Sequence, residues 1–161
     1  MRTPRVTAAS PTSLLRRVAD LARASGVFGP VSVRDGMVVC HAKDSAAPAS
    51  YRVFVEGVRL WISLVMADRW LSESIETDLL HSGDSVEALI DEELEELGGT
   101  PGVKCEHFRS EDLLFTFRTP LSIGPDRWET EAAAREAAVA LSAYEACFRR
   151  LGDMESAGED D

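Results

Sequence analysis

Apolar positions along the chain recur with two different periods. Spacings of three and four residues predict amphipathic helices, and strict alternation predicts half-buried strands. Helical spacing begins after Ser10-Pro11, where a proline at the first helical position loses no hydrogen bond, and it ends at Gly26. From Val31 the period is two. The Asp35-Gly36 pair between alternating residues predicts a tight hairpin turn, because both central positions of such a turn need positive φ.

A second hairpin is predicted about Glu56-Gly57, joining a strand from Tyr51 to Val55 with a long strand from Val58 to Met66. The long strand is apolar on both faces, which predicts a central place in the sheet or an outer face covered by something. One side of this hairpin is expected to carry an apolar patch for a partner, formed by Phe54, Trp61 and Val65.

Two helices are predicted between Asp68 and Leu97, with a break at Gly83 and capping-box spacing at Asp84-Ser85-Val86-Glu87. A third hairpin follows, from Val103 to Arg109 and from Leu113 to Arg118. A closing helix is expected from about Asp126 to Leu151. The order α, ββ, ββ, αα, ββ, α predicts an α+β fold: an antiparallel sheet of five or six strands with an N-terminal helix, two middle helices and a long C-terminal helix.

A length of 161 residues fits one domain that can bury its own core. The ends lack apolar periodicity. We therefore expect a disordered tail at residues 1–9, a single domain at 10–151 and an acidic disordered tail at 152–161.

Acidic residues dominate the charge, with 28 Asp and Glu against 17 Lys and Arg and a net charge of −11. This balance disfavours nucleic acid and anionic membranes as partners, because phosphate binding needs clustered bases. No apolar run approaches the length that spans a bilayer, and no secretory signal pattern is seen, so we expect a cytoplasmic protein. The stretch from Asp68 to Leu97 holds eleven acids and one base. Its densest part is expected to present four carboxylates to a basic partner: Glu92, Glu93, Glu95 and Glu96.

Catalytic signatures are missing: there is no glycine-rich phosphate loop, GxSxG, HExxH or CxxC. The three cysteines are an odd number at long spacings, which disfavours a disulfide framework. Cys105 and His107, two apart on a strand, share one face and could be joined by either Cys40 or His41 in a zinc site. The simpler interpretation is a core cysteine beside a surface histidine, with no metal or other cofactor.

The element order resembles the type III secretion chaperone-like fold, including YbjN-like bacterial proteins. The resemblance is carried by the helix from Leu14 to Ala24, the two strands of the second hairpin, the helices from Arg69 to Leu97, the pair of strands from Val103 to Arg118, and the closing helix. It implies a small acidic protein, commonly dimeric, that binds other polypeptides through apolar patches and has no catalytic residues.

These observations lead to a non-enzymatic module that captures a protein or peptide partner through an apolar patch with an acidic rim, and that forms a homodimer. Two alternatives stay open. One is a small metal-dependent or small-molecule enzyme that uses Cys105, His107 and carboxylates. The other is an acidic decoy of a nucleic-acid surface, which should bind a basic partner with a steep dependence on salt.

Overall fold

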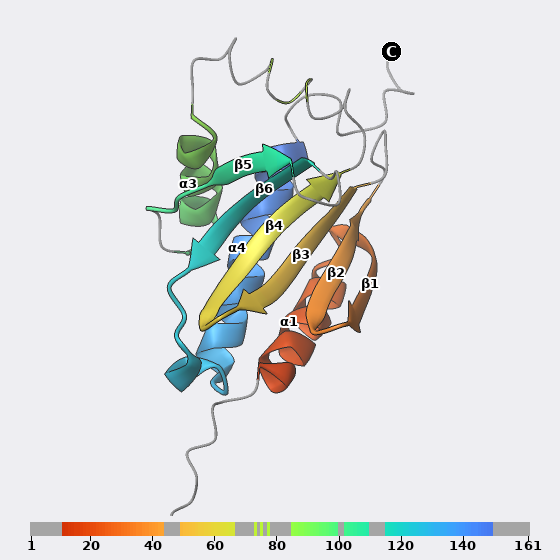
Figure 1. Ribbon diagram of the computed structural model, residues 1–161, viewed down its shortest axis with the longest axis vertical. Helices are drawn as coiled ribbons and strands as arrows, with labels where there is room; N and C mark the ends of the chain where they lie inside the picture. Colours follow the sequence, from red (N-terminus) through yellow and green to blue (C-terminus); the bar gives the residue numbers. More distant parts are fainter. Residues whose placement is uncertain are drawn as a thin grey trace, which may run out of the picture.

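The computed structural model describes residues 11–43, 49–66, 85–99, 102–109 and 115–149, together with Glu73, Ile75 and Thr77. Both predicted tails lie outside these residues. So does most of the first middle helix, of which the three separate residues are helical and Ile75 is buried. The elements in order are α1 (Thr12–Ser25), β1 (Phe28–Arg34), β2 (Met37–Ala42), β3 (Ala49–Glu56), β4 (Arg59–Met66), α3 (Val86–Glu96), β5 (Glu106–Arg109), β6 (Phe115–Leu121), the 3-10 turn η1 (Pro125–Arg127) and α4 (Glu131–Arg149) (Figure 1).

The strands form one six-stranded antiparallel sheet in the order β1-β2-β3-β4-β6-β5. Strand β4 pairs with β3 on one side and with β6 on the other, so its apolar residues on both faces belong to an interior strand. The α+β fold with an N-terminal and a C-terminal helix is confirmed.

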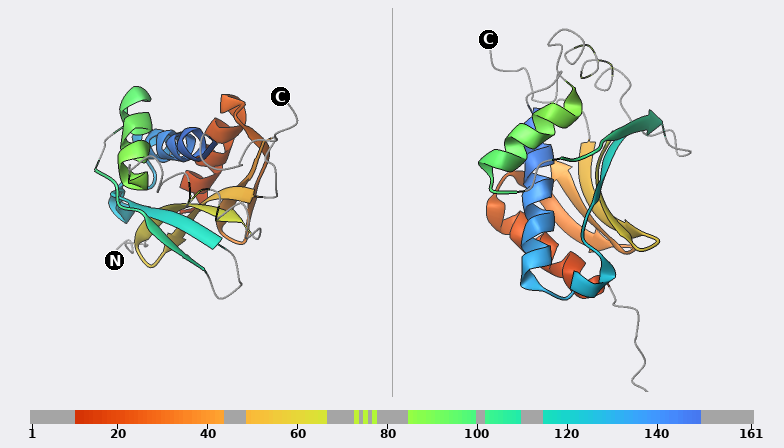
Figure 2. Two further views of the ribbon diagram at one scale, coloured as in Figure 1. Left: turned by 90° about the horizontal axis from the view of Figure 1, so that it is seen from above. Right: turned by 90° about the vertical axis from the view of Figure 1, so that its left-hand side faces the viewer.

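Helices α1, α3 and α4 lie on the same side of the sheet, with α4 between the other two (Figure 2). We call the sheet face towards these helices the inner face and the opposite one the outer face. The helix α1 buries Leu14, Leu15 and Val18, and α4 buries Leu141, Tyr144 and Phe148. These side chains meet the alternate strand residues that point inward, such as Tyr51, Val53, Ile62, Leu64 and Phe117.

The first hairpin turn is as predicted, with φ of 52° at Asp35 and 74° at Gly36. The second turn lies one residue later than predicted. Glu56 pairs with Arg59, so the central residues are Gly57 and Val58, and the φ of Gly57 is 66°. Only the first central position is left-handed, as in a type II′ turn, which takes glycine there. Alternation along the predicted strand puts Val58 on the same face as Leu60 and Ile62, but Val58 is 72% exposed at the tip.

Three helix predictions need correction. Helix α3 is capped by Ser85, whose hydroxyl accepts a hydrogen bond from the Ala88 N–H at 3.0 Å, rather than by Asp84. Helix α4 begins at Glu131 instead of near Asp126, because Pro125–Arg127 form a separate 3-10 turn and the Thr130 hydroxyl accepts from the Ala133 N–H. In α1, Leu21 was placed on the apolar face but is 38% exposed.

The two edges of the sheet are β1 and β5. Strand β1 contains Pro30, and its register with β2 shifts between Phe28 and Val31. Strand β5 has four residues. None of the helices within the described ranges is long and apolar enough to cross a membrane.

Candidate partner-binding face

The outer face of the sheet carries no helix among the described residues (Figure 2). Strand register arranges its side chains in rows that cross the strands. One row, which we call the apolar band, consists of Met37, Phe54, Trp61 and Pro120. The next row runs from Val39 through Arg52, Ser63 and Arg118 to Glu106, and we call its three central residues, Arg52, Ser63 and Arg118, the polar row. An apolar strip therefore lies beside a row with two guanidinium groups.

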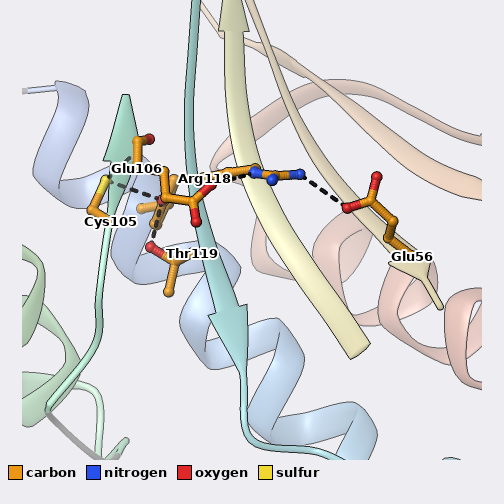
Figure 3. Close-up of polar contacts among 6 residues, drawn as sticks. Glu56, Cys105, Glu106, Arg118 and Thr119 are labelled. Atoms are coloured by element: carbon orange, nitrogen blue, oxygen red, sulfur yellow. Dashed lines mark hydrogen bonds and ion pairs between the residues drawn. The ribbon is translucent and has the colours of Figure 1, made fainter. Parts of the chain in front are cut away.

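Arg118 connects the two rows. Its guanidinium carbon lies 4.0 Å from the centroid of the Trp61 ring, within cation–π range. Its Nε donates to Glu106 Oε1 at 2.8 Å, and its Nη1 donates to Glu56 Oε1 at 3.2 Å. Figure 3 shows the side chain reaching from β6 towards Glu56 at the end of β3. Burial lowers the pKa of the Arg118 guanidinium, but the hydrogen bonds and charges of Glu106 and Glu56 outweigh it and raise that pKa.

Ser63 lies between the two arginines of the polar row and is 1% exposed. Its Oγ is a buried polar atom that has no hydrogen-bond partner among the residues that the structure describes. Leaving such a group unpaired costs roughly 1–3 kcal/mol. The polar row therefore contains a buried hydroxyl whose hydrogen-bonding capacity is not used by the described part of the chain.

The three predicted contact residues on the hairpin do share the outer face, as alternation indicated. The expected exposure is wrong for Trp61 and Val65, each of which is only 7% exposed. Phe54 is half-buried, as are its row neighbours Met37 and Pro120. The accessible apolar area on this face thus lies on Phe54, Met37 and Pro120, with the Trp61 indole as a rigid neighbour.

The predicted acidic rim does not border this apolar band. Glu92, Glu95 and Glu96 are exposed and Glu93 is half-buried on α3, which packs against α4 in the helical layer. The outer face points away from that layer (Figure 2). The sheet therefore separates the apolar band from the α3 carboxylates, and the acids beside Arg118 are Glu56 and Glu106 instead.

Cys105 belongs to a hydrogen-bonded cluster on the inner side of the sheet. Its N–H donates to Glu87 Oε2 at 2.8 Å, and its Sγ lies 3.6 Å from the Tyr144 hydroxyl. That hydroxyl is 2.6 Å from Thr119 Oγ1. Burial raises the pKa of the Cys105 thiol, although hydrogen bonds from Tyr144 and Thr119 act in the opposite direction. The cluster therefore connects the residue before β5 with β6 and α4, and burial favours the protonated form of the thiol.

The other three residues considered for a zinc site, His107, Cys40 and His41, do not assemble around Cys105. The His107 ring stacks on Phe117 with 3.9 Å between centroids. Cys40 lies on β2, and β3, β4 and β6 separate that strand from β5, so neither Cys40 nor His41 can join Cys105 and His107. Within the described ranges, no group of three or more His, Cys, Asp or Glu side chains is arranged to hold a metal.

Three residues of the outer face were missed from the sequence: Arg118, Pro120 and Met37. Thr116, Arg118 and Pro120 alternate along one strand, and this alternation could have placed Arg118 outward. The predicted strand ended at Arg118, whereas β6 continues to Leu121, so Pro120 was left out. Neighbouring strands far apart in the sequence bring Arg118 to Trp61, and local periodicity carries no information about that pairing.

No protein-family model, curated protein or solved structure matches this chain. The resemblance to the type III secretion chaperone-like fold thus rests on the order of helices and strands alone.

Proposed function

We propose that this protein is a non-enzymatic module that binds another polypeptide through the outer face of its sheet. The observation that supports this most is the apolar band on a face without a helix among the described residues. Half-buried Phe54 and Pro120 lie on either side of a tryptophan that contacts Arg118, and Met37 lies beyond Phe54 in the same row. Aromatic residues at the centre of a rigid patch, next to an arginine, are typical of interface hot spots.

Binding would use both rows of the face. Apolar side chains of the partner pack on Phe54, Met37 and Pro120, and the area removed from water contributes about 25 cal/mol per Å². The guanidinium of Arg118 is already oriented by Glu56 and Glu106, so little side-chain entropy is lost when a partner contacts it. Affinity therefore comes from apolar contact on a preorganised surface.

A second copy of the chain is one partner in this proposal. A homodimer formed face to face through the apolar band would cover the same side chains. Light scattering on the purified protein should then give twice the monomer mass, and Phe54→Asp should give the monomer mass. A monomer for the unmodified chain contradicts the dimer, while binding to a different polypeptide is tested separately.

The test of partner binding begins with affinity capture and mass-spectrometric identification, and continues with calorimetry on the purified partner. Phe54→Asp should weaken binding at least about tenfold, since it places a charge in the apolar band. Val58→Ser is the matched control, because Val58 is an exposed apolar residue at the tip of the same hairpin. Equal affinity of the Phe54→Asp and Val58→Ser proteins would contradict the proposal.

Salt separates this function from the acidic decoy. In 1 M salt the Debye length is about 3 Å, so interactions between exposed charges are screened. Binding through the apolar band should therefore persist at this salt concentration, whereas binding through surface carboxylates should be lost. A triple variant, Glu92→Gln, Glu95→Gln and Glu96→Gln, removes exposed charge from α3 without touching the band. If this variant and high salt abolish partner binding, the decoy is the correct function.

A further inference from the structure

A pocket with a volume of about 780 Å³ lies at a separate place, where the end of α3, the segment before β5, the end of β6 and the first half of α4 meet. Its size is within the range of about 300–1,000 Å³ that is usual for small-molecule sites. Among its described lining residues, Pro120 also belongs to the apolar band, whereas Trp61 and Phe54 do not line it.

The charge of the pocket is opposite to that of the chain. Its described lining includes three bases, Lys104, Arg127 and Arg135, and one acid, Glu136. The whole chain has 17 bases and 28 acids. Bases gathered around one hollow in an acidic protein produce a local positive field that favours an anion.

The bases differ in how strongly they are already paired. Arg127 donates a short hydrogen bond to Glu136, so this pair is neutralised. Arg135 faces Glu131 at 3.9 Å, a loose and exposed contact. Lys104 is exposed and makes no ion pair with any residue that the structure describes. Lys104 and Arg135 can therefore bind an anion with little competition from the protein.

The wall of the pocket is aliphatic, with Leu94, Val103, Leu121, Ile123 and Val139 among its residues. No aromatic side chain is present in the described lining, so a nucleobase would have no stacking partner. Gly99 keeps this wall closely packed, because an added Cβ would lie 2.9 Å from Leu94 Cδ2 and 3.0 Å from Val139 Cγ1. The surroundings suit an alkyl chain.

We propose that this pocket binds an amphipathic organic carboxylate, with its alkyl chain against the aliphatic wall and its carboxylate at Lys104 and Arg135. A guanidinium and an ammonium group are both suitable donors to a carboxylate. The alkyl chain of the ligand thus matches the aliphatic wall, and its carboxylate matches the two basic side chains. Binding of this ligand does not require a partner on the outer face, although Pro120 belongs both to the pocket lining and to the apolar band.

Calorimetry with octanoate, 1-octanol and acetate tests the proposal. Octanoate should bind saturably with one site per chain. Acetate lacks the chain and octanol lacks the charge, so each should bind at least about tenfold more weakly. Chemical-shift changes in the octanoate titration should centre on the amides of Gly98 and Gly102, which line the pocket.

The variant Lys104→Glu with Arg135→Glu should weaken octanoate binding about tenfold or more and leave octanol binding unchanged. The matched control, Arg16→Glu with Arg34→Glu, makes the same change in net charge at exposed positions outside the pocket and should bind octanoate as the unmodified protein does. Circular dichroism verifies that both variants are folded. Equal octanoate affinity of the two variants, octanol binding as tight as octanoate, or the absence of octanoate binding would each overturn the proposal.

Discussion

Buried polar groups on the two faces of the sheet differ in their hydrogen bonding. On the inner face, the hydroxyls of Tyr144 and Thr119 bind each other at 2.6 Å, and Cys105 lies beside them. On the outer face, the Ser63 hydroxyl is buried without a partner, and the neighbouring Arg118 depends on two carboxylates that are more than half exposed. Among the described residues, Tyr144, Thr119 and Cys105 on the inner face are thus hydrogen-bonded to one another, whereas Ser63 Oγ on the outer face has no partner. This difference is why we assign stability to the inner face and binding to the outer one.

Truncating an aromatic residue on each face should give the largest contrast. Phe148 is fully buried between Phe117 and Tyr144, so Phe148→Ala should lower the free energy of unfolding by about 3–5 kcal/mol. Phe54 is half-buried, and Phe54→Ala should cost about 1 kcal/mol. Urea denaturation measures both. Equal losses would mean that the outer face is as much a part of the core as the inner face.

Alkaline pH should destabilise the inner face through its thiol and phenol groups. Burial raises the pKa of Cys40 from 9.0 to about 12. Between these values the unfolded chain releases a proton that the folded chain retains, so the contribution of Cys40 is complete below pH 9 and is lost as pH rises towards 12. The expected slope is about 1.4 kcal/mol per pH unit.

The control for this pH effect is Cys40→Ala. Burial also raises the pKa of Tyr51, which adds to the loss above pH 10 in both proteins. The difference between the two slopes therefore isolates Cys40. Urea denaturation from pH 8 to 11 should show a flatter profile for the variant, and parallel profiles would contradict the retained proton.

Removing the Tyr144 hydroxyl tests the inner polar cluster. Tyr144→Phe leaves Thr119 Oγ1 buried without its partner and should cost about 1–2 kcal/mol in the free energy of unfolding. Tyr51→Phe is the control, because the Tyr51 ring is also buried and its hydroxyl lies outside the cluster of Tyr144, Thr119 and Cys105. A smaller loss for Tyr144→Phe than for Tyr51→Phe would show that the cluster adds no stability.

Removing the Ser63 hydroxyl should have the smallest effect and the opposite sign. Ser63→Ala deletes an unpaired buried oxygen, so the free energy of unfolding should stay the same or rise by up to about 1 kcal/mol. Thermal denaturation of the two proteins gives this difference. A loss of stability would mean that the hydroxyl is satisfied in solution, and the contrast between the faces would be weaker than described.

Local patterns were sufficient for most of the fold. The period-two segments, with turn residues such as Asp35-Gly36, located the first two hairpins, and their number predicted a sheet of five or six strands, of which the structure has six. The second turn was placed one residue too early, since the sequence Glu56-Gly57-Val58 permits glycine at either central position. The pairing of Glu56 with Arg59 decides between them, and pairing is a property of two strands.

The candidate site was predicted less completely. Alternation put Phe54, Trp61 and Val65 on one face, but it could not indicate how much of each side chain neighbouring strands would cover. The contact of Arg118 with Trp61 joins strands from distant parts of the chain. The α3 carboxylates were predicted to form the rim of this patch because acidic residues are densest there, although the sheet lies between them and the apolar band in space.

The edges of the sheet bear on how the protein behaves at high concentration. Strand β1 has a proline and a register shift, and β5 has only four residues. A proline offers no N–H to an incoming strand, and a short or irregular edge is a poor template for one. The chain can therefore keep a broad sheet face without a helix over its described part while resisting edge-to-edge polymerisation. Replacing Pro30 with valine would restore an N–H on this edge, and we expect the variant to form fibrils more readily.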